Sequence, residues 1–310
     1  MLTSLAALAA LQHPDGCFPS TVVGRHATRA DRNGFTTALV VRALRDAPGA
    51  EPIRSAALEY VATCAAPCPP GAFGFWPQRA RPGWAPHLPP DADDTAIMTI
   101  ELLRAGRISR REALRTAASV LLRHRLAESR SIRPPWVVPG AFLTWLASPD
   151  LPNLVDCCVN ANVVALLALL DATDLPGYGA AVATVSAAVA WAGERPARHR
   201  AITPFYPTIA GLHESVEHAV ECGAAELAPT LAALRQIDEG PAPGPDTGWC
   251  CSAYSATVWR CAALAAARAF RTSVTTRSPT CFSPGTPTSP APSSRARSAS
   301  TTPTAAVPSS

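Results

Sequence analysis

Three carboxylates lie close together at Asp91, Asp93 and Asp94, between a proline-rich approach and an apolar run that begins at Ile97. Like charges packed this closely cannot all ionise cheaply, so we expect at least one carboxyl to have a raised pKa and to stay protonated near neutral pH. A neutral carboxylic acid in an apolar surrounding is a proton donor toward a weak base. A helix N-cap needs only one such residue. The spacing alone leaves open a catalytic acid and a structural or metal-binding role.

The composition indicates a helical globular chain. Of the 310 residues, 48% are hydrophobic and 16% are charged, which allows a large buried core. Leu and Ala dominate the apolar runs, and this favours helices over strands. The net charge of +4 is carried by four arginines from Arg271 onward, so residues 1–270 are neutral overall. That balance predicts no nucleic-acid partner.

Cysteines and the first residues bear on the compartment. The ten cysteines form neither a secreted disulfide framework nor tandem zinc-ribbon spacing. Residues 1–12 lack a basic stretch and are predicted to form an amphipathic helix, not a signal peptide. No apolar run is bounded like a membrane span. We therefore expect a cytoplasmic protein.

Apolar and amphipathic segments alternate along the chain. Segments that are apolar nearly all round or that open with polar groups predict buried helices near 35–45, 94–105, 157–171, 204–220 and 251–270. Segments with a polar face or an Ala-rich composition predict exposed helices near 1–12, 52–64, 109–126, 176–194 and 223–238. This alternation predicts an all-α fold, an (α/α) barrel of about five to six helical hairpins.

Polar residues stand at the starts of the predicted buried helices. In a barrel these positions meet at one mouth, and they are Asp31, Asn33, the three carboxylates, Asp156, Asn160, Asn162, Tyr206 and His213. Asp156 and Asn160 share a helix face, whereas Asn162 is offset. Buried amides need hydrogen-bond partners. Substrate contact and structural hydrogen bonding both remain open for Asp156, Asn160 and Asn162.

Residues Asp91 to Ala96 resemble the DxDDTA motif of class II terpene cyclases, the squalene-hopene and copalyl diphosphate type. The resemblance implies that Asp93 protonates an alkene or epoxide, with Asp91 and Asp94 as its supports. The loop 71–77 and the turn 16–19 look like repeat signatures of these cyclases and of protein prenyltransferases, which are (α/α) barrels.

The same resemblance implies an isoprenoid substrate, contact with a membrane surface through that apolar substrate, and no required cofactor. Mg²⁺ matters only where the substrate carries a diphosphate. Such cyclases normally place the acid between two helical domains, and this chain has room for one. We therefore expect either a barrel that encloses its own site or a partner domain or chain that completes the cavity.

Aromatic side chains near the mouth are candidates for stabilising carbocations through their ring faces. Ordinary packing is the alternative for each of them. They are Phe75, Trp76, Trp84, Tyr206 and Trp249.

Three other functions compete with the cyclase. A zinc-dependent prenyltransferase-like site would use Asp156 and Cys158 with His213 or His218. Paired-carboxylate hydrolysis also occurs on helical toroids. The third alternative is a non-catalytic relic of a cyclase, since the composition changes abruptly after Phe270.

We therefore predict one enzymatic domain over residues 1–270 and a disordered Ser/Thr/Pro/Ala-rich tail over residues 271–310. The predicted reaction is protonation-initiated cyclisation of an isoprenoid, with Asp93 as the acid and no metal ligands.

Overall fold

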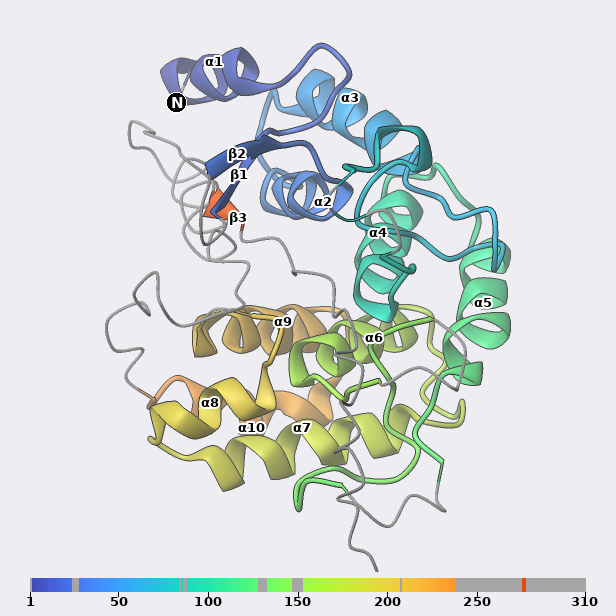
Figure 1. Cartoon of the computed structure of the whole chain (residues 1–310), viewed down its shortest axis with the longest axis vertical. Coiled ribbons are helices and arrows are strands. Elements are labelled where there is room, and N and C mark those ends of the chain that lie inside the picture. Colours follow the sequence, from blue (N-terminus) through green and yellow to red (C-terminus); the bar gives the residue numbers. More distant parts are fainter. Residues whose placement is uncertain are drawn as a thin grey trace, which may run out of the picture.

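The structure, a computed structural model, describes residues 2–23, 28–83, 85, 88–127, 133–146, 153–206, 208–237 and 275–276. Helices dominate this part of the chain (Figure 1). The α-helices are α1 (Leu2–Leu11), α2 (Gly34–Ala43), α3 (Glu51–Ala62), α4 (Ala92–Arg104), α5 (Arg110–Ser119), α6 (Cys157–Leu169), α7 (Tyr178–Ala192), α8 (Pro196–Ile202), α9 (Ile209–Glu221) and α10 (Ala228–Leu234). Single 3₁₀ turns are η1 (Gln78–Ala80), η2 (Leu121–Arg123) and η3 (Ala225–Leu227).

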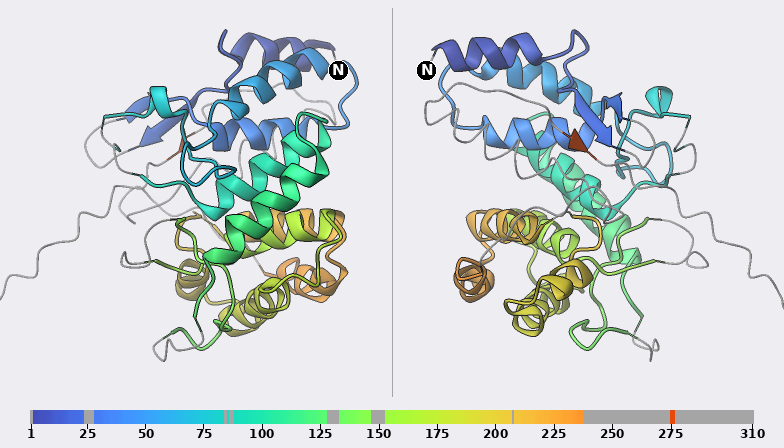
Figure 2. Two further views of the ribbon diagram at one scale, coloured as in Figure 1. Left: turned by 90° about the vertical axis from the view of Figure 1, so that its right-hand side faces the viewer. Right: turned by 60° about the vertical axis from the view of Figure 1, so that its left-hand side comes forward.

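Four buried helices follow one another side by side. Helix α2 contacts α4, α4 contacts α6, and α6 contacts α9. A more exposed helix packs on each of them, namely α3 on α2, α5 on α4, α7 on α6 and α10 on α9. Helices α1 and α3 lie together at one end of the molecule, and α7, α8 and α10 lie at the other (Figures 1 and 2). The predicted alternation of buried and exposed helices is confirmed for these segments.

A closed ring of hairpins is not shown. The fifth buried helix was predicted near 251–270, and these residues lie outside the described part of the chain. The mostly helical fold is therefore established, while the barrel stays a prediction.

Local sequence explains why the helices begin where they do. Asp91 precedes α4, and its side chain accepts a hydrogen bond from the backbone N–H of Asp94. Asp156 caps α6 in the same way. Ser109 and Glu112 form the reciprocal capping box that opens α5. Helix α6 contains no charged residue and is buried from Cys157 to Ala168, as expected for a helix at the centre of a helical layer.

The described strands were not predicted from the sequence. The stretch between residues 13 and 33 was predicted to be a loop, but it contains an antiparallel hairpin of β1 (Ser20–Val23) and β2 (Thr28–Asp31). Of the predicted tail, only β3 (Thr275–Thr276) lies within the described residues, and it pairs in parallel with β1, giving the strand order β2-β1-β3. Strand β1 offers a second edge whose backbone groups can pair with a β-branched segment, and composition alone does not reveal this.

The short helix α8 was also not predicted. Of the helices that the structure describes, none combines the length and the apolar character that crossing a bilayer requires.

Candidate functional site

Asp93 lies at the meeting point of three segments that are distant in sequence. It is in the first turn of α4 and is 7% exposed. Its Oδ1 accepts a hydrogen bond from Asn162 Nδ2 of α6 at 2.8 Å, and its Oδ2 accepts one from the hydroxyl of Tyr206, which precedes α9. Burial raises the pKa of Asp93, and the two hydrogen bonds partly offset that rise. The predicted convergence of Asp93, Asn162 and Tyr206 is therefore confirmed.

Asp91 and Asp94 form a buried carboxyl pair beside Asp93. The Oδ1 of Asp91 accepts the backbone N–H of Asp94 at 2.7 Å, which makes Asp91 the N-cap of α4. Burial and the charge of Asp93 raise the pKa of Asp91 to about 7. Burial, followed by the charge of Asp91, holds the pKa of Asp94 well above its usual range.

The surroundings of Asp94 favour its protonated form. Asp94 is 1% exposed, and neither of its carboxyl oxygens accepts a hydrogen bond from any donor in the described residues. Its carboxyl does interact with that of Asp91, and such an interaction is attractive only when one of the two groups carries a proton. The raised pKa values of both carboxyls agree with what the close spacing of the carboxylates predicts.

Asp156 has a structural role beside these three carboxyls. It is fully buried, and burial raises its pKa to about 7. Its Oδ1 accepts the backbone N–H groups of Cys158 and Val159, and its Oδ2 accepts that of Phe205 at 3.1 Å. Since Phe205 precedes Tyr206, Asp156 ties the Tyr206 segment to the start of α6.

Asn160 and Asn162 have different roles although they are two residues apart. Asn160 exchanges both hydrogen bonds with the backbone of Phe142, at 2.9 and 3.0 Å, which favours the structural alternative for this residue. Asn162 reaches Asp93 and also lies 3.3 Å from Ser215 Oγ. Two residues correspond to about 200° around a helix, so the two amides face opposite sides of α6.

A row of aromatic rings leads away from Tyr206. Its ring lies edge-on to Phe35 with centroids 6.2 Å apart, and Phe35 stacks on Phe75 at 5.7 Å. The ring centroids of Phe75 and Trp76 are 4.6 Å apart, and the indole N–H of Trp76 donates to Asp31 Oδ1 at 2.8 Å. The structure thus joins three predicted aromatic residues, Phe75, Trp76 and Tyr206, in one row. The predicted Trp84 and Trp249 lie outside the described residues.

Sequence reasoning missed Phe35, Ser215 and Gly211. Phe35 opens a predicted buried helix, and that position was the available signal. Ser215 is a small polar residue on the apolar face of α9. A Cβ on Gly211 would lie 2.7 Å from Tyr206 Cδ1, so the absence of a side chain there lets the Tyr206 ring lie against α9.

The predicted zinc ligands are not brought together. The carboxylate of Asp156 is occupied by backbone N–H groups, and His218 Nε2 lies 3.2 Å from Arg104 Nη1. Within the described residues, neither His213 nor His218 forms a ligand cluster with Asp156 and Cys158.

Comparisons with known proteins add little. No protein-family model and no curated protein matches the chain. A crystal structure of a protein from Actinoplanes matches with a TM-score of 0.47 and 18% sequence identity, over 75% of this chain and 62% of that one. The chain thus spans less than two thirds of that protein's length, and a likeness of this size says nothing about function.

Proposed function

We propose that this protein catalyses the protonation-initiated cyclisation of an isoprenoid, with Asp93 as the general acid. The observation that carries the proposal is a buried carboxyl held on both sides by Asn162 and Tyr206, next to two carboxyls whose pKa values are also raised. The resemblance of residues 91–96 to the acid motif of class II terpene cyclases supports the same reaction.

The surroundings of Asp93 suit an acid that must first keep its proton and then release it. Burial favours the neutral acid at rest. In that state the Tyr206 hydroxyl oxygen can accept a hydrogen bond from the protonated carboxyl. After Asp93 has given its proton to the substrate, the Tyr206 hydroxyl donates a hydrogen bond to the carboxylate. Hydrogen bonds to an ionised acceptor are stronger than those to a neutral one, so Tyr206 and Asn162 stabilise the charge that develops on Asp93 in the transition state.

The carboxyl pair holds Asp93 in position. Asp91 caps α4, and this fixes the direction of the first turn that carries Asp93. In this proposal the pair therefore acts on Asp93 through position, without contacting the substrate.

The proposed reaction also forms a carbocation, which needs a different environment from the acid. Ring faces attract a cation through their quadrupole, and Tyr206, Phe35 and Phe75 form a continuous row beside the acid. Buried, largely apolar helices would exclude the water that intercepts such a cation. In this proposal the hairpins belong to an (α/α) barrel, the substrate is an isoprenoid, and no cofactor is required beyond Mg²⁺ for a diphosphate.

The test compares wild type with Asp93→Asn, which keeps the shape of the side chain but removes the donatable proton. Farnesyl diphosphate, geranylgeranyl diphosphate and squalene serve as substrates, and products are analysed by mass spectrometry. General acid catalysis is worth roughly 10²–10⁴-fold in rate, and we expect a loss of that size.

The matched control is Asp156→Asn, a carboxyl that is also buried and whose partners are backbone N–H groups. It should lose stability but less than about tenfold in rate, because it has no proton-transfer role. Equal product from wild type and Asp93→Asn would contradict the assignment of the acid. No product from wild type with any of the substrates would contradict the cyclase proposal and favour the non-catalytic relic.

A further inference from the structure

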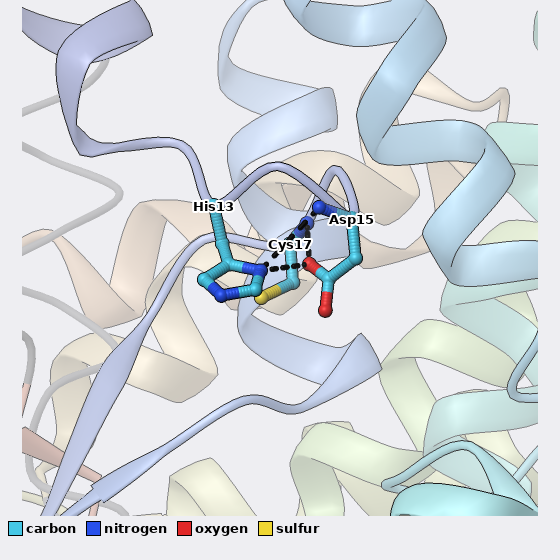
Figure 3. A group of neighbouring side chains, drawn as sticks. All are labelled: His13, Asp15 and Cys17. Atoms are coloured by element: carbon cyan, nitrogen blue, oxygen red, sulfur yellow. Dashed lines mark hydrogen bonds and ion pairs between the residues drawn. The ribbon is translucent and has the colours of Figure 1, made fainter.

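A second group of chemically capable side chains lies in the turn between α1 and β1. The ligand atoms of His13, Asp15 and Cys17 are all within 4.8 Å of one another. Figure 3 shows the three side chains gathered on one side of this turn. We propose that the turn is a zinc site, with His13 Nδ1, Asp15 Oδ1 and Cys17 Sγ as its three protein ligands.

Backbone hydrogen bonds close the turn without a metal. The N–H of Gly16 donates to His13 O at 2.8 Å, and the N–H of His13 donates to Cys17 O at 2.9 Å. The N–H of Cys17 also donates to Asp15 Oδ1 at 3.1 Å. All three ligand residues are therefore fixed relative to one another, which lowers the ordering cost of binding.

Contacts with α3 hold the turn in place. Gln12 Nε2 donates to Gly16 O at 2.8 Å and to Ile53 O at 2.9 Å. Gly16 has a φ of +93°, and a Cβ at this position would lie 2.0 Å from Ala56 O. Only glycine allows this close approach, so the turn has a fixed position against α3.

The three side chains already contact one another. His13 Nδ1 lies 2.8 Å from Asp15 Oδ1, and the Cys17 thiol interacts with the same carboxylate. The Asp15 carboxylate therefore contacts both His13 and Cys17.

Zinc binding can be written as a balanced exchange. Cys17 releases its thiol proton to solvent and forms the Zn–S bond, neutral His13 binds through Nδ1 with its proton on Nε2, and Asp15 binds through Oδ1. The thiolate and the carboxylate neutralise the Zn²⁺ charge. A water completes four-coordination, and cysteine, histidine and aspartate are all accepted zinc ligands.

Arg32 competes with the metal. Its Nη1 lies 3.1 Å from Asp15 Oδ2 and 3.1 Å from His13 Nε2. Once zinc holds Nδ1, the Nε2 atom carries a proton and can no longer accept from a guanidinium. The Arg32 side chain is 48% exposed, so it can withdraw into solvent. Arg32 therefore closes the metal-free turn and weakens zinc binding.

The test uses Co²⁺ as a spectroscopic probe for the zinc site. The purified full chain is treated with a chelator and titrated with Co²⁺, and its absorption is followed in the near ultraviolet and the visible. We expect a thiolate-to-cobalt charge-transfer band that saturates at one Co²⁺ per chain and disappears when Zn²⁺ is added. Cys17→Ser should abolish the band, whereas Cys68→Ser, at an exposed cysteine, should keep it.

Two further variants keep the proposal falsifiable if Cys17→Ser fails to fold. His13→Ala removes a side chain that is 41% exposed, and it should weaken Co²⁺ binding by more than the roughly 10–100-fold that a lost outer-shell partner costs. Arg32→Ala should tighten binding by about tenfold, because a unit positive charge a few ångströms from the metal is removed. No charge-transfer band in wild type, or an equal band and affinity in His13→Ala, would overturn the zinc site.

Discussion

The two ends of the buried helices solve the problem of buried charge in opposite ways. At the N-terminal ends, Asp91, Asp93, Asp94 and Asp156 are all buried, and the pKa of each is raised. At the C-terminal ends of α2 and α4, arginines surround the buried Glu101 of α4. Acids at the N-terminus and bases at the C-terminus both suit the helix dipole. The first end reduces its charge by binding protons and the second by ion pairing.

The arginine end is built around one carboxylate. Arg42 Nε and Arg45 Nη2 lie 3.4 and 3.2 Å from Glu101 Oε1, and Glu101 is 2% exposed. Burial and the charges of Arg42, Arg104 and Arg45 hold the pKa of His218 well below its ordinary value, so this residue stays neutral. Guanidinium groups do not lose protons in proteins. Only the acid end therefore offers a proton near neutral pH, and the arginine end serves as scaffold.

The largest stability effect is expected at the arginine end. Glu101→Ala leaves Arg42 and Arg45 without their shared carboxylate, and breaking a buried ion pair costs about 3–5 kcal/mol. The free energy of unfolding from urea titration measures this loss. Glu59→Ala is the control, because the Glu59 side chain is 66% exposed and pairs with Arg107, whose side chain is 40% exposed. It should cost less than about 1 kcal/mol. Equal losses in the two variants would mean that Glu101 does not organise this end.

A smaller effect, on rate, is expected at the acid end. Tyr206→Phe keeps the ring against Phe35 but removes the hydroxyl that donates to Asp93. A hydrogen bond to a charged group is worth about 1.5–3 kcal/mol, so kcat should fall by roughly 10–100-fold. The melting temperature should change little. A rise in KM alone, with kcat unchanged, would argue that Tyr206 binds substrate and does not stabilise the Asp93 carboxylate.

The pH dependence of stability has a small slope per pH unit and a definite sign. The pKa of Asp156 rises from 3.8 to about 7 on folding, so between these values the folded state binds more protons than the unfolded state. Its contribution to stability is complete below pH 3.8 and is lost as the pH rises toward 7. The slope is at most about 1.4 kcal/mol per pH unit for one group.

Asp156→Asn isolates this contribution. Urea titrations between pH 5 and 8 should give a difference from wild type that shrinks as the pH rises, because wild type alone loses the stability of a neutral Asp156. His218 contributes in the opposite direction, since its lowered pKa destabilises the folded state as the pH falls, but it cancels in the difference. A difference that does not change with pH would place the Asp156 pKa near its ordinary value.

Much of this arrangement could be predicted from the sequence because it depends on local patterns. Helix periodicity and cap residues depend on neighbours within a few positions, and the helices capped by Asp91, Asp156 and Ser109 begin where predicted. The convergence of Asp93, Asn162 and Tyr206 followed from the alternation of buried and exposed helices.

Other features depend on packing between distant segments. The place of Phe35 between Tyr206 and Phe75 depends on how α2 lies against the loop before α4. Asn160 and Asn162 are the same residue type two positions apart, and only the surroundings of α6 assign one to the backbone of Phe142 and the other to the acid. The hairpin of β1 and β2 is too short for its pattern to stand out from a loop.

The central claim is that a proton from Asp93 enters the product, and solvent deuterium tests it most directly. In D₂O the exchangeable proton of Asp93 becomes a deuteron. The reaction proposed here then gives a cyclised product with a single deuterium at the carbon that is protonated first, and Asp93→Asn gives none. A cyclised product without deuterium, or a deuterated product from Asp93→Asn in equal amount, would contradict the account.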